Sequence, residues 1–183
     1  MIKGLCDHGV REILLIVADG TVGLEDRIKE YFSKADFQSC VIYKVRNTLS
    51  KVRAKDRKKA AKDLKRIYQV STEEDALMGF GNFKEKWRGE YPKVVKSWEQ
   101  ELIKLLTFFK YPESIKRVIY TTNLIEMTVK EIRRIVKVIG ALPSLDAAVK
   151  FVYLRVVMLN DRIVNRFLEA REDIQEMFSM RYF

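Results

Sequence analysis

The chain has 183 residues, of which 48% are hydrophobic, enough for one domain with a buried core. A formal net charge of +10 attracts polyanions, and nucleic acid is the polyanion that such a charge favours. Two cysteines are too few for a disulfide scaffold, and the longest aliphatic run, residues 13–18, is far shorter than the roughly 20 residues of a membrane span. Many basic proteins simply have solvated lysine-rich faces, so the charge alone does not decide the partner. We therefore expect a cytoplasmic protein with no membrane partner, which would be nucleoid-associated if its charge serves DNA.

The first segments predict a strand, a helix and a second strand. Residues 12–18 contain an apolar run, residues 13–18, that Asp19-Gly20 closes, which is typical of a strand buried on both faces. Residues 37–43 form a second β-like run. Apolar side chains recur at helical spacing between them: Leu24, Ile28, Tyr31 and Phe32. Such a unit predicts parallel strands with a right-handed crossover, and Asp19 at a carboxyl end where ligands gather.

The remainder of the chain is predicted to be helical from Lys44 onward. Ser71 followed by Glu74 indicates a capping box at the start of one helix. Further helices are predicted over 123–139 and over 146–167, with glycine and proline between them. The predicted fold class is therefore α/β but mostly helical, with a two-stranded sheet that is marginal by itself.

Asp19 is the first candidate for chemistry. A carboxylate at the end of a buried strand can bind a hard divalent cation through oxygen. The alternative is an ordinary turn aspartate, because Asp-Gly after a strand is common turn chemistry. A second metal-binding side chain close to Asp19 would decide between these interpretations.

Glu126 is the second candidate, near the start of a predicted helix whose N-terminal dipole tolerates negative charge. Lys130, Arg133 and Lys137 follow it at i+4, i+7 and i+11, which places one acid above a basic stripe. That combination suits a metal ion beside a phosphate backbone. A plain first-turn helix glutamate is the alternative.

Basic side chains dominate residues 44–66, where only Asp56 and Asp63 oppose them. The basic residues are Arg46, Lys51, Arg53, Lys55, Arg57, Lys58, Lys59, Lys62, Lys65 and Arg66. Phosphate contacts are one use of such a segment. A solvated helix face is the equal alternative, because the charge surrounds the predicted helix and forms no single stripe.

Three blocks stand out in order along the chain: residues 17–24 with Asp19-Gly20, residues 40–47 with Cys40 and Asn47, and residues 120–126, which end at Glu126. In this order they resemble the mutator-type DDE transposases of bacterial and archaeal insertion sequences, whose nuclease core is similar to ribonuclease H. Residues 17–24 resemble the strand-end block that bears the second catalytic Asp of that family. Residues 120–126, Tyr-Thr-Thr-Asn-Leu-Ile-Glu, resemble the signature whose Glu completes the catalytic triad. Cys40, Arg46 and Asn47 resemble the block between them.

The resemblance implies a division of the chain and a set of roles. Residues 1–43 would be part of a ribonuclease H-like core, 44–116 an all-helical basic insertion, and 117–183 the helix with the catalytic Glu and the C-terminal helices. Asp19 and Glu126 would be catalytic metal ligands for Mg²⁺ or Mn²⁺. The DNA-binding residues would include Arg46, Lys51, Arg53, Lys58, Lys62, Lys130, Arg133, Arg134 and Lys137.

The resemblance also implies the reaction, which is cleavage of double-stranded DNA at element ends and joining to target DNA by metal-assisted phosphoryl transfer. The first catalytic Asp of the family has no counterpart here, so we expect a truncated, catalytically incomplete transposase with a weak or empty metal site. A DNA-binding remnant without activity and a non-functional relic are the alternatives. A homo-oligomer or an intact transposase would be the protein partner.

Side chains around the catalytic groups follow the family in part. Cys40 and Asn123 match its motifs, whereas Tyr43 replaces the usual His and Val129 replaces the usual Asn. Tyrosine can still donate one hydrogen bond but valine cannot, so the orientation of the metal ligands is expected to differ.

Overall fold

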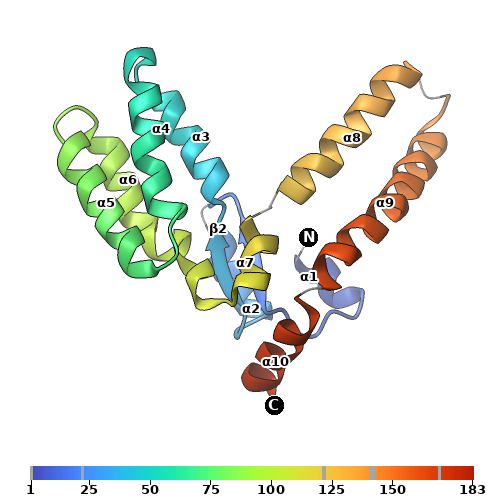
Figure 1. Cartoon of the computed structure of the whole chain (residues 1–183). Helices are drawn as coiled ribbons and strands as arrows, with labels where there is room; N and C mark the ends of the chain where they lie inside the picture. The colour runs from blue at the N-terminus through green and yellow to red at the C-terminus, as the bar shows by residue number, and fades with distance from the viewer. Residues whose placement is uncertain (1, 22, 121–122, 141–142, 169) are drawn as a thin grey trace. The chain divides into compact units, whose positions relative to one another are not determined.

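The computed structural model describes residues 2–21, 23–120, 123–140, 143–168 and 170–183 (Figure 1). Within these ranges, side chains at 117–118, 120, 123–128, 138–139 and 161–167 lie outside the description. The chain divides into two compact units, Met1–Tyr111 and Pro112–Phe183, each of which has its own internal packing.

The first unit begins with a short helix, α1 (Ile2–Asp7), followed by the predicted strand–helix–strand unit. Strands β1 (Leu15–Ala18) and β2 (Asp36–Ser39) pair in parallel, with helix α2 (Leu24–Tyr31) as the crossover. The sheet packs against a small core of buried side chains: Ile28, Phe32, Ala35 and Phe37. The mostly helical α/β fold class and the parallel pairing are therefore confirmed.

Two details of the predicted strands are wrong. β1 is not buried on both faces, since each residue from Leu15 to Ala18 is half-exposed. Ile16 and Ala18 pack on the α2 core, and alternation turns the residues between them to the other side. The second strand ends at Ser39 and not at Tyr43, because Cys40 caps a helix that begins at Val41.

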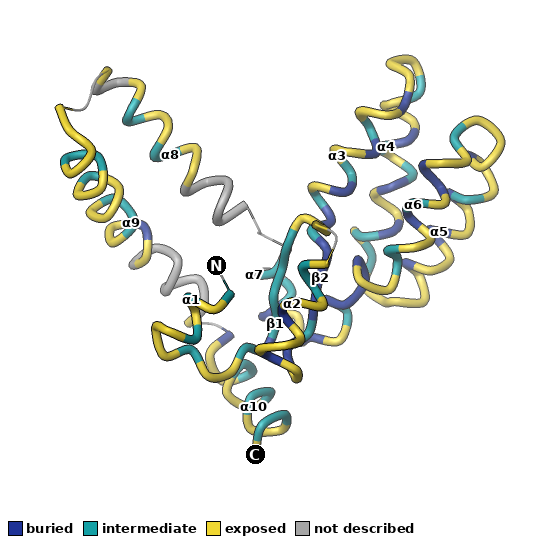
Figure 2. The backbone as a smooth tube through the Cα atoms, turned by 180° about the vertical axis from the view of Figure 1, so that it is seen from behind, coloured by how far each residue is buried: buried dark blue, intermediate teal, exposed yellow. Residues whose placement is uncertain are grey.

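The rest of the first unit is a helical layer. It comprises α3 (Val41–Lys51), α4 (Ala54–Tyr68), α5 (Glu73–Trp87), α6 (Pro92–Leu105) and the short 3₁₀ helix η1 (Thr107–Lys110). Figure 2 shows buried residues along these helices, and the largest are aromatic. Phe83 packs between Trp87 and Trp98, with ring centroids 6.4 and 6.2 Å apart.

The start of α5 differs from the predicted capping box. Thr72 is the N-cap, and its hydroxyl accepts the backbone N–H of Asp75 at 3.1 Å. Ser71 therefore lies one position outside the cap. Acidic residues in the first turn of α5 favour the same end of the helix, since they complement its dipole.

Buried polar side chains fix the strand unit to the helical layer. Gln38, which is 1% exposed, donates from Nε2 to the carbonyl of Leu105 at 2.8 Å and accepts the N–H of Phe108 at 2.8 Å. On the neighbouring helix, the indole N–H of Trp98 donates to Thr48 at 2.7 Å. α6 is thereby held against the carboxyl end of β2 and against α3.

The second unit is helical throughout its described part. It contains α7 (Glu113–Tyr120), α8 (Asn123–Ile139), α9 (Leu145–Leu168) and α10 (Arg171–Tyr182). α8 and α9 match the helices predicted over 123–139 and 146–167, and Arg155 reaches from α9 to Glu131 of α8 at 3.5 Å. None of the helices in the described part of the chain has the length and apolarity to cross a membrane.

Candidate functional site

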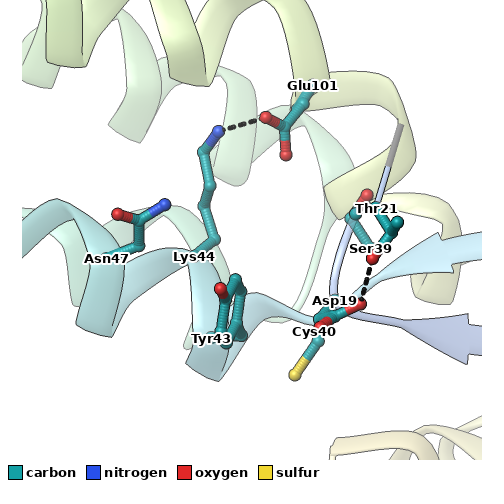
Figure 3. A pocket seen from close by; sticks show the side chains of 9 residues that line it. Asp19, Thr21, Ser39, Cys40, Tyr43, Lys44, Asn47 and Glu101 are labelled. Atoms are coloured by element: carbon teal, nitrogen blue, oxygen red, sulfur yellow. Dashed lines mark hydrogen bonds and ion pairs between the residues drawn. The ribbon is translucent and has the colours of Figure 1, made fainter.

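A pocket of about 260 Å³ opens at the carboxyl ends of both strands (Figure 3). It is lined by Asp19, Gly20, Thr21, Ser39, Cys40, Tyr43, Lys44, Asn47 and Glu101. The strand ends, the start of α3 and one residue of α6 therefore meet at one place. The position matches the general rule that ligands bind beyond the carboxyl ends of parallel strands.

Asp19 follows the last residue of β1 and is exposed to the pocket. Its Oδ1 atom accepts a hydrogen bond from the Thr21 hydroxyl at 2.9 Å, which orients the carboxylate. Gly20 adopts φ +70°, a left-handed conformation that lets the chain turn away directly after Asp19. The sequence thus places one oriented carboxylate at the strand end.

The start of α3 forms a second wall. The backbone N–H of Cys40 donates to the carbonyl of Ala18 at 2.6 Å, which ties the end of β2 to the end of β1. α3 begins at the next residue, so its N-terminal turn carries Tyr43 and Lys44 into the pocket lining. Tyr43 is 49% exposed there, in the position where the resemblance expects a histidine.

Lys44 and Glu101 form an ion pair in the pocket wall. Lys44 Nζ donates to Glu101 Oε1 at 2.5 Å, to the Ser97 carbonyl at 2.9 Å and to the Ser97 hydroxyl at 2.8 Å. The lysine side chain is 8% exposed and the glutamate 37%. The ammonium is therefore buried against α6, whereas the carboxylate remains partly open to the pocket.

The pocket chemistry fits a hydrated divalent cation. Mg²⁺ keeps several waters and is bound by one or two carboxylates, and the pocket holds the oxygens of Asp19 and Glu101. The Lys44 charge, which would oppose a cation, is offset by Glu101. Among the described side chains, no group of three or more His, Cys, Asp or Glu residues could hold a metal ion. Any cation here would therefore be coordinated largely by water.

The second candidate carboxylate cannot be placed. Glu126 belongs to α8, but its side chain and that of Asn123 lie outside the described residues. The basic residues that follow it on α8 are exposed: Lys130, Arg133, Arg134 and Lys137. Arg134 contacts Glu131 at 3.2 Å, so its charge is partly offset.

Some side chains of the basic segment form contacts within the first unit. Arg53 forms ion pairs with Asp56, at 3.3 Å, and with Glu90, and it donates to the Tyr91 hydroxyl at 2.9 Å. The same hydroxyl donates to Asp56 at 2.6 Å and holds the pKa of that carboxyl below its ordinary value. Arg53 therefore links the start of α4 to Glu90 and Tyr91, while its side chain remains 57% exposed. Arg46 and Lys51 are exposed on α3.

Most of the charge on α4 lies on one side, which differs from the predicted ring of charge. The exception is the exposed Arg57, which lies at i−3 from the buried Ala60 and donates from Nε to the Val52 carbonyl at 3.0 Å. The buried residues of α4, Ala60, Leu64 and Ile67, recur at i, i+4 and i+7 and face the helical core. The exposed basic residues cover the side away from the core: Lys55, Lys58, Lys59, Lys62, Lys65 and Arg66. None of them forms an ion pair with a carboxylate among the described side chains. We call these six residues the α4 basic face.

Glu101 and Ser97 are site residues that the sequence did not reveal. They lie on α6, and Glu101 is 57 residues from Lys44, in a segment with ordinary amphipathic spacing. A single acid on an exposed helix position carries no local signal. Only the packing of α6 against the strand ends brings it to the pocket.

Comparisons with known proteins point to one family. Residues 1–165 match the family model described as "Transposase, Mutator family". The chain is 33% identical over 186 residues to a probable transposase for an ISRM3-like insertion sequence element of Sinorhizobium fredii, which covers 98% of the chain and 46% of that protein. It is 36% identical over 151 residues to the transposase for insertion sequence element IS905 of Lactococcus lactis. That match covers 82% of the chain and 38% of the relative.

A third relative is the transposase for insertion sequence element ISRM3 of Rhizobium meliloti, at 32% identity over 186 residues. That match covers 98% of the chain and 46% of the relative. The chain therefore spans about half the length of the curated relatives it matches most fully.

Proposed function

The chain belongs to the Mutator family of transposases, and we propose that it takes part in moving insertion sequences by cutting and joining DNA. The observation that carries this proposal is the position of Asp19, an oriented carboxylate at the end of a parallel strand, facing a pocket with room for a hydrated cation. Phosphoryl transfer needs oxygen ligands placed in this way.

The finer fold assignment is part of the same proposal. The parallel β1–α2–β2 unit is a ribonuclease H-like core segment, and α3 to η1 form the helical insertion. The region from residue 117 onward carries the third catalytic carboxylate. Support comes from the buried links of Gln38 and Lys44 to α6 and η1, which attach the helical layer to the strand ends.

In this reaction, Asp19 and Glu126 serve as two metal-binding carboxylates. The chemistry that bound Mg²⁺ or Mn²⁺ supplies is activation of a water or 3′-hydroxyl nucleophile and stabilisation of the leaving oxygen. Thr21 holds the Asp19 carboxylate in one orientation, and the Cys40–Ala18 bond fixes the strand end beneath it. These residues keep a ligand oxygen in place, so little reorganisation is needed when substrate arrives.

Double-stranded DNA is the substrate we propose, and exposed basic residues are its contacts. The α4 basic face and the exposed α8 residues Lys130, Arg133 and Lys137 supply charge for the phosphate backbone. Exposed Arg46 and Lys51 extend this charge on α3. Transposition joins two element ends, so we also propose that the active form is a homo-oligomer.

The test is a cleavage assay on a labelled duplex that spans the junction between the element and its flanking DNA. Because the sequence predicts a weak metal site, we expect only weak cleavage with Mg²⁺ or Mn²⁺, and its nicked and joined products should disappear in Asp19→Asn and Glu126→Gln. Asp26→Asn, an exposed acid on α2, is the matched control and should behave like wild type. Products that form without a divalent cation, or that persist in Asp19→Asn, would contradict the proposal.

DNA binding without cleavage is the second candidate function, and the α4 basic face favours it. Six unpaired charges on one exposed helix face can bind phosphates with no need of a metal site. Salt-dependent DNA binding by the full chain, with no cleavage under any cation, would support this candidate over the first.

A further inference from the structure

The pocket contains a second carboxylate whose charge is controlled by a buried lysine. Both Asp19 and Glu101 line it, and Lys44 forms the ion pair with Glu101. Figure 3 shows the Lys44–Glu101 and Asp19–Thr21 pairs around the same space. Formal charges of two carboxylates and one ammonium leave one net negative charge at the strand ends.

Lys44 offsets the negative charge of Glu101 and has no free donor for a ligand. An ammonium has three N–H donors, and Lys44 uses them on the Ser97 carbonyl, the Ser97 hydroxyl and Glu101 Oε1. The side chain is 8% exposed, so no donor remains for a phosphate in the pocket. Its charge is nevertheless felt across the pocket, because water screens a buried charge only weakly.

Glu101 keeps one oxygen for the pocket. Oε1 takes the bond from Lys44, whereas Oε2 lies beside the turn after Asp19, 3.6 Å from the position that a Cβ atom on Gly20 would occupy. The side chain is 37% exposed despite the ion pair. The glutamate thus faces the residue next to Asp19 while α6 holds it in position.

We propose that Lys44 and Glu101 set the charge of the pocket beside Asp19. Glu101 acts through its charge as a second carboxylate facing a divalent cation, and Lys44 offsets that charge. This inference rests on the proposed role of Asp19 as a metal ligand. It also gives the helical layer a direct part in cation binding, since Glu101 belongs to α6.

Removal of the Glu101 charge and removal of the Lys44 charge should shift the Mn²⁺ affinity in opposite directions. A purely structural role of the two residues would not produce opposite shifts. Glu101→Gln leaves the pocket neutral, so Mn²⁺ affinity should fall by roughly three- to tenfold. Lys44→Met leaves two negative charges, so the affinity should rise by a similar factor. The double variant Lys44→Met/Glu101→Met restores one net negative charge and should bind Mn²⁺ within about twofold of wild type.

The experiment is calorimetric titration of the full chain with Mn²⁺, with a thermal melt of each variant. Glu99→Gln is the matched control, because Glu99 is also a lysine-paired acid on α6 but does not line the pocket. Its affinity should equal that of wild type. If Lys44→Met alone does not fold, the Mn²⁺ affinity of the double variant is compared with that of Glu101→Gln instead. The double variant should fold, since an apolar pair often replaces an ion pair without loss of stability.

The inference is overturned if Lys44→Met and Glu101→Gln shift the affinity in the same direction. It is also overturned if Glu101→Gln binds Mn²⁺ like wild type, or if the double variant binds as weakly as Glu101→Gln. Asp19→Asn separates this result from the proposed function. Mn²⁺ binding that is unchanged in Asp19→Asn contradicts the metal role of Asp19 itself, and a wild-type chain that binds no Mn²⁺ overturns both.

Discussion

The side-chain oxygen of Gln38 accepts the backbone N–H of Phe108 at 2.8 Å, across 70 residues of sequence. The amide nitrogen of the same side chain donates to the carbonyls of Leu105 and Ser39. Gln38 therefore satisfies the polar backbone where α6 ends and η1 begins, and it precedes the pocket residue Ser39 in sequence. Its removal should loosen the attachment of the helical layer.

We predict that Gln38→Met lowers the free energy of unfolding of the first unit by about 2–4 kcal/mol, because buried backbone groups of Leu105 and Phe108 lose their partners. Both tryptophans lie in this unit, so fluorescence during urea unfolding reports on it alone. Gln100→Met, an exposed position on α6, is the control and should change stability by no more than about 0.5 kcal/mol. Equal losses of stability in Gln38→Met and Gln100→Met would contradict this stabilising role of Gln38.

Two glycines of α5 give a matched pair for the packing of α4 against α5. A Cβ on Gly79 would lie 2.3 Å from the backbone oxygen of Arg66, whereas a Cβ on Gly81 meets nothing within 4 Å. Gly79→Ala should therefore destabilise the unit by about 1–3 kcal/mol. Gly81→Ala should be neutral or stabilising by up to about 1 kcal/mol, since alanine favours a helix. The opposite order in urea unfolding would show that the helices pack differently.

The Asp63 carboxyl should make the stability of the first unit depend on pH. Burial raises its pKa, but hydrogen bonds from Lys86 at 2.7 Å and Trp87 at 3.0 Å outweigh burial and hold the pKa below its ordinary value of 3.8. A carboxyl with a lowered folded pKa stabilises the fold above its unfolded pKa. That stability is lost as the pH falls through the folded pKa.

Asp63→Asn should therefore be less stable than wild type by about 1 kcal/mol at neutral pH. The difference should narrow as the pH falls below 3.8. Fluorescence-detected melts at a series of pH values test this, and Lys86→Ala should reproduce part of the neutral-pH loss. A difference that stays constant with pH would mean that the charge of Asp63 does not matter.

The α4 basic face predicts a measurable change in DNA binding. Lys58→Ala/Lys62→Ala should weaken binding to any duplex and lower the salt slope by about two, one for each lost phosphate contact. Lys93→Ala/Lys96→Ala removes the same charge from exposed positions on α6 and should have a smaller effect. Titrations between about 50 and 200 mM salt make the comparison. Equal effects would mean that net charge alone drives binding.

The sequence predicted the parts of the site that depend on local pattern. The apolar run before Asp19, the crossover helix α2 and the position of α8 follow from hydrophobic spacing, which is a strong signal when it repeats. The switch from strand to helix at Cys40 was not predictable in this way. Val41 and Ile42 favour a strand by local propensity, but packing of α3 against α6 overrides that preference.

Contacts distant in sequence account for what was missed at the pocket. Glu101 reaches the strand ends only because Gln38, Lys44 and Thr48 fasten α6 to them. The one-sided charge of α4 depended on knowing which residues face the core, and the lysine-rich composition concealed that periodicity. Tertiary packing, and not residue type, decided both features.

The most direct test of the central claim is to map the cation site with Fe²⁺ in place of Mg²⁺. Fe²⁺ with ascorbate and peroxide generates hydroxyl radicals that cut the backbone close to the bound ion, and mass spectrometry locates the cuts. We predict cuts around Asp19 that excess Mg²⁺ suppresses and that Asp19→Asn abolishes. A chain that is not cut around Asp19, or cuts there that persist in Asp19→Asn, would contradict the metal-binding role of Asp19.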